Sequence, residues 1–539
     1  MRKMTKGLVV MLALILLVTT YLGVGVAVGG DDGVLTLTAF IDEPATGPLN
    51  WKWGDDPTSR WITEQTGIRI EVTCAADDTG TQLATMLASG EKLPDFIQSR
   101  LNKPSRRQLI AQEFVLPLNK LADEYYPEFW DVLPEQMDTL YTEDDGNLYL
   151  LTDWYGAPNR EDEIGELNNN TPISININKA IYEEMGSPDI STWEKFVAHL
   201  ADVKEQHPEI GYIFYDQYGQ ITEHNRSMPN LVARLFGAQN DFYEVNSDSS
   251  LTLLPRTQAY HSMLEECNKL FRAGIINPEM YTHAFQSDQQ REVMLSRNFY
   301  AYCGNYWAMI EMMSLPMEEE YFTIDFPLPE GVDKAAFHVH NDFLYIGHHT
   351  LFVTADTEHP AECIKYLAFL LSDEGQYAQR YGTEGISFVF DEDGIPVYTE
   401  AKNTAEAEGF DVLQRTLGVH NYNFAWLTQM WVASKGAQYT YPYEGILNHF
   451  RLVTPYMKGE RLADMSWDVS GEDNLVLKEQ IVNIWRAVVP QIITAADDAA
   501  FEAAYNKFMS DLEAANVSKL EEVVSENRVN WISRGLEAD

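Results

Sequence analysis

Apolar and polar positions early in the chain switch between the period of a strand and that of a helix. Leu83 and Leu87 lie four positions apart, which is the spacing of one helix face, and Gly67 and Gly90 stand where two predicted helices end. The predicted elements are, in order, strand Val34–Ile41, helix Arg60–Thr66, strand Ile68–Val72, helix Thr81–Ala88 and strand Pro94–Ile97. Strands that alternate with helices favour an α/β fold with a central sheet.

Later segments repeat both patterns. Ile173–Ile177 predicts a strand, and Ser191 precedes Glu194 by three positions, which is the capping-box signature of a helix start. Ala361–Leu371 is amphipathic, and Leu475–Glu526 carries apolar and charged residues at helical spacing. Because 539 residues exceed what one hydrophobic core supports, we expect two or three lobes.

The amino-terminal segment has the pattern of an export signal. Arg2, Lys3 and Lys6 form a basic cluster, and Leu8–Val28 then runs without a charged residue. This run is long enough to span a bilayer, so the segment is either cleaved after a small residue or retained as a membrane anchor. Either outcome predicts that the rest of the chain works outside the cytoplasm, secreted or tethered through residues 1–30.

The charge balance narrows the range of partners. The chain has 38 Lys and Arg against 82 Asp and Glu, which gives a formal net charge of −44. Such a surface repels the phosphates of nucleic acids and anionic lipid headgroups, so we expect neither as a partner. A hydrophobic content of 45% is sufficient for packed cores and excludes wholesale disorder.

Cysteine and histidine positions do not predict a metal site or a cofactor. The four cysteines, none of them in a CxxC pair, are Cys74, Cys267, Cys303 and Cys363. Buried free thiols are the favoured interpretation, although the sequence leaves their disulfide state open. His338 and His340, and likewise His348 and His349, are close together but lack a convincing third ligand. GxSxG, HExxH and P-loop motifs are absent.

An ordered series of short motifs resembles one known family. The motifs, in chain order, are Thr66–Ile68, Met86–Ile97 with its "ASG" and "PD" elements, Leu116–Leu121, Asp145–Tyr149, Cys267–Glu279, Ser372–Gln376 and Tyr381–Gly385. Each motif alone is weak, but their order and spacing resemble family 1 extracellular solute-binding proteins. The most similar subgroup is the large lipoprotein-type members of Gram-positive bacteria, which serve oligosaccharide ABC importers.

The resemblance implies a two-lobed periplasmic-binding-protein-like fold (type II), each lobe a central sheet flanked by helices, with the ligand cleft between them. It implies an amino-terminal lobe at 34–160 and 340–390 and a carboxy-terminal lobe at 161–339 and 391–539. The function implied is hinge closure on a carbohydrate and its delivery to the ABC permease, without catalysis or cofactor, by a monomer.

Two departures from the family pattern change expectations. The first cysteine is Cys74, so the lipobox cysteine that anchors most members of the subgroup is missing. The stretch Gln206–Tyr212 lacks the oxygen ligands of the calcium loop that many members carry there, so we predict no calcium at that place.

Aromatic and polar residues on predicted loops are the candidate ligand contacts. A sugar offers apolar C–H faces to aromatic rings, and its hydroxyls pair with amides and carboxylates. The candidates are Trp154, Tyr155, Asn305, Trp307, Glu384, Trp51, Trp53 and Glu43. Trp426 and Trp431 have roughly helical spacing and are expected in a core instead.

Three other functions stay open at this point. An exported glycan-active enzyme would use two carboxylates, which so acidic a chain supplies everywhere. A peptide is the alternative solute. A sensor lobe of a surface receptor is the third possibility, and it requires the amino-terminal segment to remain as an anchor.

Overall fold

The computed structural model describes most of the chain. The described residues are 33–43, 51–76, 80–100, 105–143, 145–152, 173–216, 227–283, 288–305, 320–340, 349–419, 444–458 and 461–536. The structure divides into two compact units, each built from two chain segments. Unit 1 comprises Met1–Thr152 and His348–Thr428, and unit 2 comprises Asp153–Gly347 and Gln429–Asp539. The chain therefore passes between the units three times.

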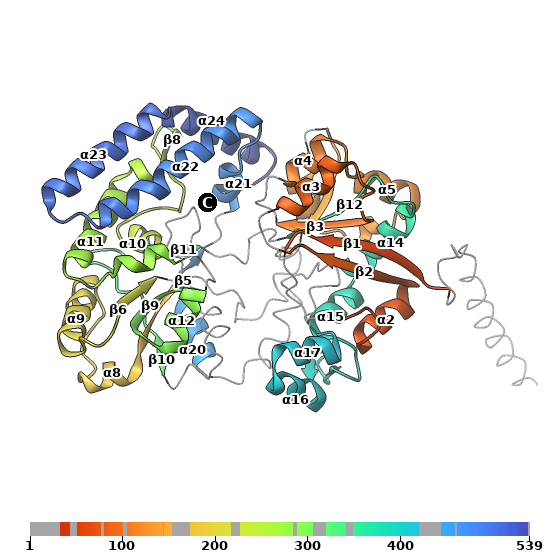
Figure 1. Ribbon diagram of the computed structural model, residues 1–539, viewed down its shortest axis with the longest axis horizontal. Helices are drawn as coiled ribbons and strands as arrows, with labels where there is room; N and C mark the ends of the chain where they lie inside the picture. Colours follow the sequence, from red (N-terminus) through yellow and green to blue (C-terminus); the bar gives the residue numbers. More distant parts are fainter. Residues whose placement is uncertain are drawn as a thin grey trace, which may run out of the picture. The chain divides into compact units, whose positions relative to one another are not determined.

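Unit 1 alternates strands and helices (Figure 1). Its first segment contains β1 (Leu35–Ile41), α2 (Pro57–Thr66), β2 (Ile68–Cys74), α3 (Thr81–Ser89), β3 (Phe96–Arg100), α4 (Ser105–Ala111), α5 (Leu118–Tyr125), α6 (Phe129–Val132), α7 (Glu135–Tyr141) and β4 (Leu150–Thr152). Its second segment contains β12 (His349–Val353), α14 (Pro360–Leu371), α15 (Asp373–Tyr381), β13 (Phe388–Phe390), β14 (Pro396–Tyr398), α16 (Glu400–Glu408) and α17 (Phe410–Leu417). The predicted order of strand, helix, strand, helix and strand at the start is confirmed.

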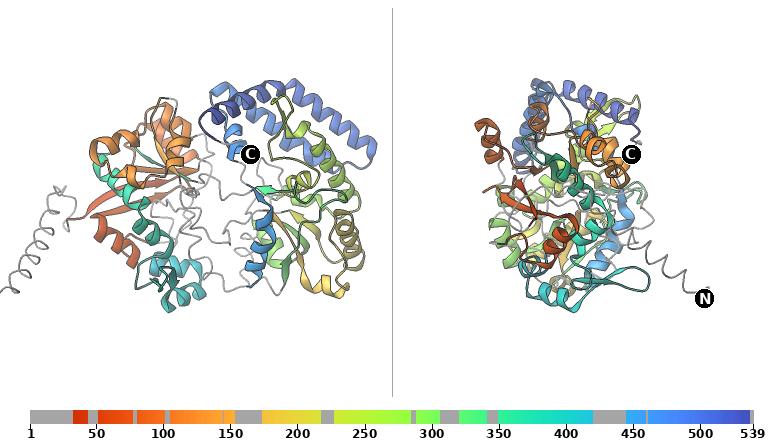
Figure 2. Two further views of the ribbon diagram at one scale, coloured as in Figure 1. Left: turned by 180° about the vertical axis from the view of Figure 1, so that it is seen from behind. Right: turned by 90° about the vertical axis from the view of Figure 1, so that its right-hand side faces the viewer.

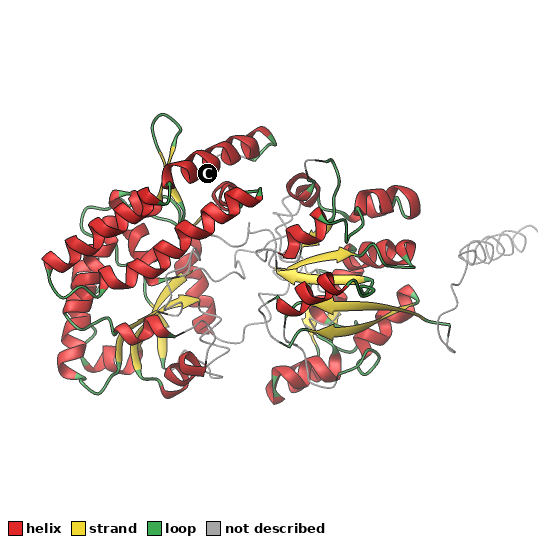
Figure 3. Cartoon of the chain, turned by 45° about the horizontal axis from the view of Figure 1, so that its top comes forward, coloured by secondary structure: helices red, strands yellow, loops and turns green. Residues whose placement is uncertain are grey.

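A five-stranded sheet forms the centre of unit 1, in the order β2-β1-β3-β12-β4. Strands β2, β1 and β3 are parallel, whereas β12 runs antiparallel to both β3 and β4. Figure 3 shows helices flanking this sheet. Strands β3, β12 and β4 are almost wholly buried, and they combine apolar residues with buried polar ones such as Gln98, Ser99 and Thr350.

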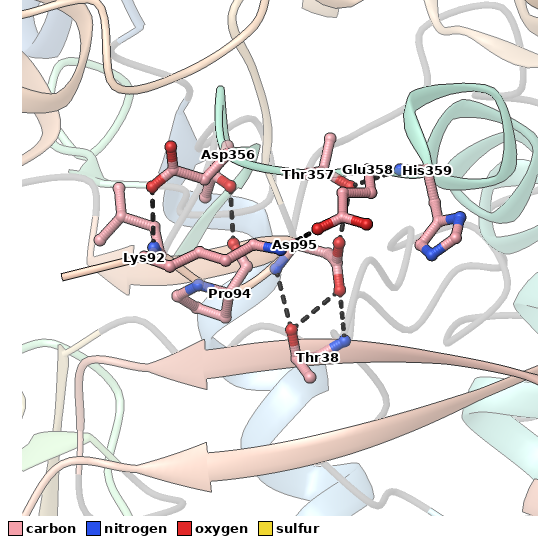
Figure 4. Close-up of polar contacts among 10 residues, drawn as sticks. Thr38, Lys92, Pro94, Asp95, Asp356, Thr357, Glu358 and His359 are labelled. Carbon is pink, nitrogen blue, oxygen red and sulfur yellow. Dashed lines mark hydrogen bonds and ion pairs between the residues drawn. The ribbon is translucent and has the colours of Figure 1, made fainter. Parts of the chain in front are cut away.

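The "PD" motif of the sequence is a structural junction of unit 1 (Figure 4). The carboxylate of Asp95, just before β3, accepts hydrogen bonds from Thr38 N and Oγ1, both at 2.8 Å, and from Thr357 Oγ1 at 2.6 Å. Thr38 lies in β1 and Thr357 in the loop after β12, so one carboxylate ties three parts of the sheet together. Asp356 adds a further link by accepting from Leu93 N.

Unit 2 has a smaller sheet and more helix. Its first segment contains β5 (Ile173–Asn178), α8 (Lys179–Glu184), α9 (Trp193–Gln206), β6 (Tyr212–Asp216), α10 (Met228–Leu235), β7 (Tyr243–Val245), β8 (Leu251–Leu253), α11 (Gln258–Arg272), α12 (Asp288–Ser296), β9 (Phe299–Asn305), β10 (Tyr321–Thr323) and β11 (Val339–His340). Its second segment contains α20 (Glu444–Val453), β15 (Met457–Lys458), α21 (Arg461–Trp467), α22 (Glu472–Ile493), α23 (Asp498–Ala514) and α24 (Val517–Ser533). Short 3₁₀ turns lie at Leu254–Arg256, Pro278–Thr282 and Thr454–Tyr456.

The central sheet of unit 2 has the order β10-β5-β9-β6, with β6 parallel and β5 antiparallel to β9. Helices α22, α23 and α24 lie together over one part of the unit (Figure 2), as the helical pattern of Leu475–Glu526 predicts. Their apolar faces join the strands in one continuous hydrophobic core, in which Trp485 of α22 and Tyr260 of α11 meet edge to face.

These observations confirm the α/β fold class, whereas the units change at 152, 347 and 428 instead of the expected 160, 339 and 390. Helices α16 and α17 belong to unit 1, although the expected boundary after residue 390 placed them in the other lobe. They do so because α17 packs against α2, where Thr58 Oγ1 donates to Leu417 O at 2.7 Å. No described helix is long and apolar enough to cross a membrane. All four cysteines are free thiols, and three of them are buried whereas Cys74 is half-buried.

Candidate functional site

The carboxyl ends of β1, β2 and β3 meet at one edge of the unit 1 sheet because these strands are parallel. In open α/β sheets, ligands bind outside the carboxyl ends of the strands. Asp42 and Glu43 directly follow β1, Arg100 ends β3, and His349 begins the antiparallel neighbour β12. We therefore expect a ligand-binding site at this edge of the sheet.

A charged cluster of Glu43, Arg100 and His349 occupies this edge. Arg100 Nε and Nη2 donate to the two Glu43 oxygens at 2.6 and 3.2 Å, and His349 Nε2 lies 3.2 Å from Oε1. Burial alone would raise the pKa of Glu43, but the hydrogen bonds and charges of His349 and Arg100 outweigh it and lower that pKa to about 2. The side chain of Glu43 is 6% exposed and that of Arg100 is 35% exposed, so the arginine is the more accessible member.

Glu43 lies on the loop directly after β1, as expected. Its two oxygens pair with Arg100 and His349, which the sequence did not predict. That this carboxylate also accepts sugar hydroxyls stays a prediction. Nearby Cys74 has its pKa raised by burial and by the charge of Glu43, which keeps the thiol protonated and unreactive.

A pair of tryptophans lies before α2, on the same side of the unit. Helix α2 connects the parallel strands β1 and β2 and therefore begins on the side where β1 ends. Trp51 and Trp53 meet edge to face, with ring centroids 6.1 Å apart and an interplanar angle of 68°, and both are half-buried. Trp51 Nε1 donates to Asp56 Oδ2 and Trp53 Nε1 donates to Thr63 Oγ1, each at 2.8 Å. Both indoles are thus fixed by bonds inside unit 1, and fixed rings are what stacking on a sugar requires.

Asp56 is the buried anchor of this loop and the N-cap of α2. Its carboxylate accepts from Ser59 N and from Trp51 Nε1, both at 2.8 Å. Burial raises the pKa of Asp56 above its usual value, against these hydrogen bonds, which lower it. Sequence analysis missed this residue, although an Asp followed by Pro57 and Ser59 has the composition of a helix start.

Glu384 lies beside the same helix start. It is exposed, on the loop between α15 and β13. The preceding residue, Thr383, is buried, and its Oγ1 lies 3.2 Å from Thr58 Oγ1 in the first turn of α2. The structure therefore brings the Trp51 indole and the loop of Glu384, which are far apart in sequence, to the start of α2, whereas the Trp53 indole is bonded to Thr63 in the last turn of that helix.

The corresponding edge of unit 2 lies at the carboxyl ends of β6 and β9. Asn305 ends β9, where its backbone pairs with Ile173 of β5. Asp216 ends β6 and is buried opposite Cys303. The predicted contact Asn305 thus lies at the edge that the topology favours, beside an acidic residue that we did not predict.

Neutral polar side chains form a chain of hydrogen bonds at the unit 2 sheet, next to this edge. His449 Nδ1 lies 2.9 Å from Thr323 Oγ1, which donates to Asn176 Oδ1 at 2.6 Å. Asn176 Nδ2 donates in turn to Ser174 Oγ at 3.0 Å. Burial lowers the pKa of His449 to about 3, so the ring is neutral at ordinary pH. These bonds attach α20 to the strands.

Several predicted residues fall outside the described part of the chain. These are Trp154, Tyr155, Trp307, Trp426 and Trp431. Within the described residues, no group of three or more His, Cys, Asp and Glu side chains is arranged to hold a metal ion. His338 contacts the Gln239 carbonyl at 2.9 Å in unit 2, whereas His349 belongs to the charged cluster of unit 1.

The chain matches one family model in sequence and several solved structures in fold. The family model for bacterial extracellular solute-binding proteins matches residues 55–377. No curated protein matches the chain in sequence.

Solved structures with a similar fold include three binding proteins. The S. pneumoniae ABC-transporter substrate binding protein FusA in complex with kestose is 16% identical, with a TM-score of 0.67 over 93% of this chain and 100% of that one. An HMO binding ABC-transporter associated solute binding protein from Bifidobacterium longum infantis is 14% identical, with a TM-score of 0.65 over 92% and 99%. The alginate-binding protein AlgQ2 is 14% identical, with a TM-score of 0.64 over 92% and 97%. Identities this low demonstrate a shared fold only.

Proposed function

Because this chain belongs to the bacterial extracellular solute-binding protein family, we propose that it captures an oligosaccharide and delivers it to the membrane subunits of an ABC importer. The indole pair Trp51 and Trp53 carries this proposal. Two half-buried aromatic rings are fixed by internal hydrogen bonds at α2, and the exposed Glu384 directly follows Thr383, which contacts Thr58 in the first turn of the same helix. Rings suit the C–H faces of a sugar and the carboxylate suits its hydroxyls.

The similar folds support the choice of solute class. FusA was solved in complex with kestose, and the other two are an HMO-binding and an alginate-binding protein. We propose that Trp154, Tyr155, Asn305 and Trp307 also contact the solute, so that both units take part in binding by hinge closure.

A thermal-shift and calorimetry screen tests the proposal. The panel contains kestose, milk oligosaccharides, alginate oligomers, mannose-containing glycans and short peptides. A saccharide present at a hundred times its dissociation constant should stabilise the protein by about 2.7 kcal/mol. Stabilisation by a peptide alone would assign the chain to a different solute class, and the absence of any binder would refute the proposal.

Matched tryptophan variants locate the site. Trp51→Ala and Trp53→Ala should each weaken binding of the saccharide at least about tenfold, since one lost aromatic contact of this kind is worth about 1.4 kcal/mol or more. Trp130→Ala is the control, because Trp130 is also partly exposed and bonded to a carboxylate, that of Asp123 at 2.9 Å in unit 1. Equal losses in all three variants would argue against a local site.

Three further parts of the proposal have separate tests. We propose that the saccharide is bound intact, so a labelled oligosaccharide should be recovered unchanged after long incubation. We propose a monomer, which light scattering measures. Mass spectrometry of the mature amino terminus shows whether residues 1–30 are cleaved or retained as a tether.

A further inference from the structure

We propose that Asp56 is a positioning residue, which fixes the Trp51 indole and couples it to the chain segment that leaves unit 1 after Gly418. This inference rests on the proposed function, because it takes Trp51 as a solute contact. It adds a mechanical link between that contact and one of the connections between the units.

The Asp56 carboxylate has little freedom to move. Its Oδ2 accepts from Trp51 Nε1 and from Ser59 Oγ, both at 2.8 Å, and its Oδ1 accepts from Ser59 N at 2.8 Å. Asp56 is fully buried. Because three donors from two directions hold the two oxygens, any displacement of the carboxylate moves the indole bonded to it.

Gly418 packs directly against this carboxylate. It ends α17 in the left-handed region with φ +70°, and a Cβ placed there would lie 2.0 Å from Asp56 Oδ1 and 2.9 Å from Thr58 Cβ. No side chain larger than hydrogen fits while Asp56 is in place. Because the two groups are in close contact, a shift of the Gly418 backbone displaces Asp56, and a shift of Asp56 displaces the Gly418 backbone.

Thr58 provides a second tie to the same segment. Its Oγ1 donates to Leu417 O at 2.7 Å and lies 3.2 Å from Thr383 Oγ1. On the other side, a Cβ at Gly382 would lie 2.7 Å from Val419 Cγ2. Residues 417–419 are therefore held between the start of α2 and the loop that carries Glu384.

Gly418 lies shortly before the point where the chain leaves unit 1 for unit 2. The second segment of unit 1 ends at Thr428, and the chain then enters unit 2. A solute that moves or orders the Trp51 ring acts on Asp56, and through Gly418 on the start of this connection. Packed groups without free space transmit such displacements, because they cannot deform gradually.

Fluorine NMR on the unliganded full chain tests the link without any ligand. The protein is labelled with 5-fluorotryptophan, and Trp51→Phe assigns the Trp51 signal. Gly418→Ala should shift or broaden that signal. Gly67→Ala is the matched control, because Gly67 ends α2 with φ +72° and ψ +10°, against φ +70° and ψ +14° for Gly418, yet has no atom within 4 Å of the added Cβ. A Trp51 signal that responds equally to both variants, or to neither, overturns the proposal.

A binding experiment with the best saccharide of the panel completes the test. Asp56→Asn and Thr58→Val should weaken binding several-fold, whereas Asp123→Asn, which alters the Trp130 pair, should not. If Trp51→Ala abolishes binding while Asp56→Asn and Thr58→Val bind as wild type does, Asp56 has no positioning role. If no saccharide binds at all, the proposed function fails, and the fluorine experiment still decides the coupling. Should Gly418→Ala not fold, Thr58→Val replaces it in the NMR comparison.

Discussion

The two units hold polar side chains at their sheets by different means. Unit 1 gathers charges at its carboxyl edge, where Glu43 pairs with Arg100 and His349. Unit 2 has neutral hydrogen-bonded side chains at its sheet instead. There His449 is bonded to Thr323 and is kept uncharged by burial. The difference shows that a buried carboxylate is tolerated when Arg100 and His349 satisfy it, whereas the buried imidazole of His449, which contacts the Thr323 hydroxyl, stays neutral.

Unit 2 also contains an ion pair, but away from its sheet. Arg234 of α10 donates to both oxygens of Asp241 at 3.0 and 2.8 Å, and both side chains are 1% exposed. The Arg234–Asp241 pair is completely buried, whereas Arg100 of the unit 1 cluster is 35% exposed. Comparing the two therefore shows how burial changes the contribution of an ion pair to stability. The following predictions use calorimetry or urea denaturation of the full chain, with the transitions of the two units resolved where they separate.

The largest effect is expected for Asp241→Asn. The substitution removes the carboxylate charge that pairs with the buried Arg234 guanidinium, and breaking a buried pair in this way should cost about 3–5 kcal/mol of unfolding free energy in unit 2. Glu522→Gln is the control, because its partner Lys519 lies 3.1 Å away and both side chains are about half exposed or more. A small loss for Asp241→Asn would mean that water reaches the pair.

At neutral pH, Glu43→Gln should have the next largest effect, in unit 1. The pKa of Glu43 is about 2 in the folded protein and near the ordinary 4.5 in the unfolded chain. Its contribution of about 3 kcal/mol is therefore complete above pH 4.5 and is lost as pH falls toward 2. Denaturation curves of variant and wild type should differ at pH 7 and converge near pH 2. A difference that does not depend on pH would contradict the ionic account.

Because of His449, the stability of unit 2 should depend on pH between about 6.5 and 3, a different range from that of Glu43. Its pKa falls from 6.5 to about 3 on folding, so below pH 6.5 the unfolded chain binds a proton that the folded unit excludes. Stability should therefore fall by about 1.4 kcal/mol per pH unit between pH 6.5 and about 3. His449→Asn should remove this slope, and Glu43→Gln should leave it unchanged between pH 6.5 and 5. If Glu43→Gln also flattened that slope, the two units would not titrate separately.

Asp95→Asn should have the smallest effect, at the other end of β3. The amide keeps the shape of the carboxylate but weakens its bonds to Thr38 and Thr357, which should cost about 1 kcal/mol. Lys92→Ala serves as the control in the same loop, because Lys92 and Glu358 form an exposed pair whose loss should not be measurable. Equal effects would mean that Asp95 does not join the strands.

The sequence predicted the elements of unit 1 well, because local signals mark them. Gly67 ends α2 with a left-handed backbone, and Thr66 and Ile68 lie on either side of the change from helix to strand. The place of α16 and α17 was not predictable in the same way. Their assignment depends on Thr58 and Leu417, which are 359 positions apart in the chain.

The candidate site shows the same limit. Trp51, Trp53 and Glu384 could be selected because residue type and loop position suggest sugar contacts. The part played by Glu43 could not, since a carboxylate after a strand looks the same whether it meets solute or Arg100. Asp56 was missed because its importance comes from Gly418, a residue with no side chain to attract notice.

By itself, the sequence determined the α/β class, the family and the loops that carry candidate contacts, because periodicity, turn residues and ordered motifs are local properties. Only the tertiary structure decided which carboxylates are bound internally, which helices belong to which unit, and which distant loops share one helix end. The physical reason is that burial and pairing set the energy of a polar group, and both depend on neighbours that the chain supplies from far away.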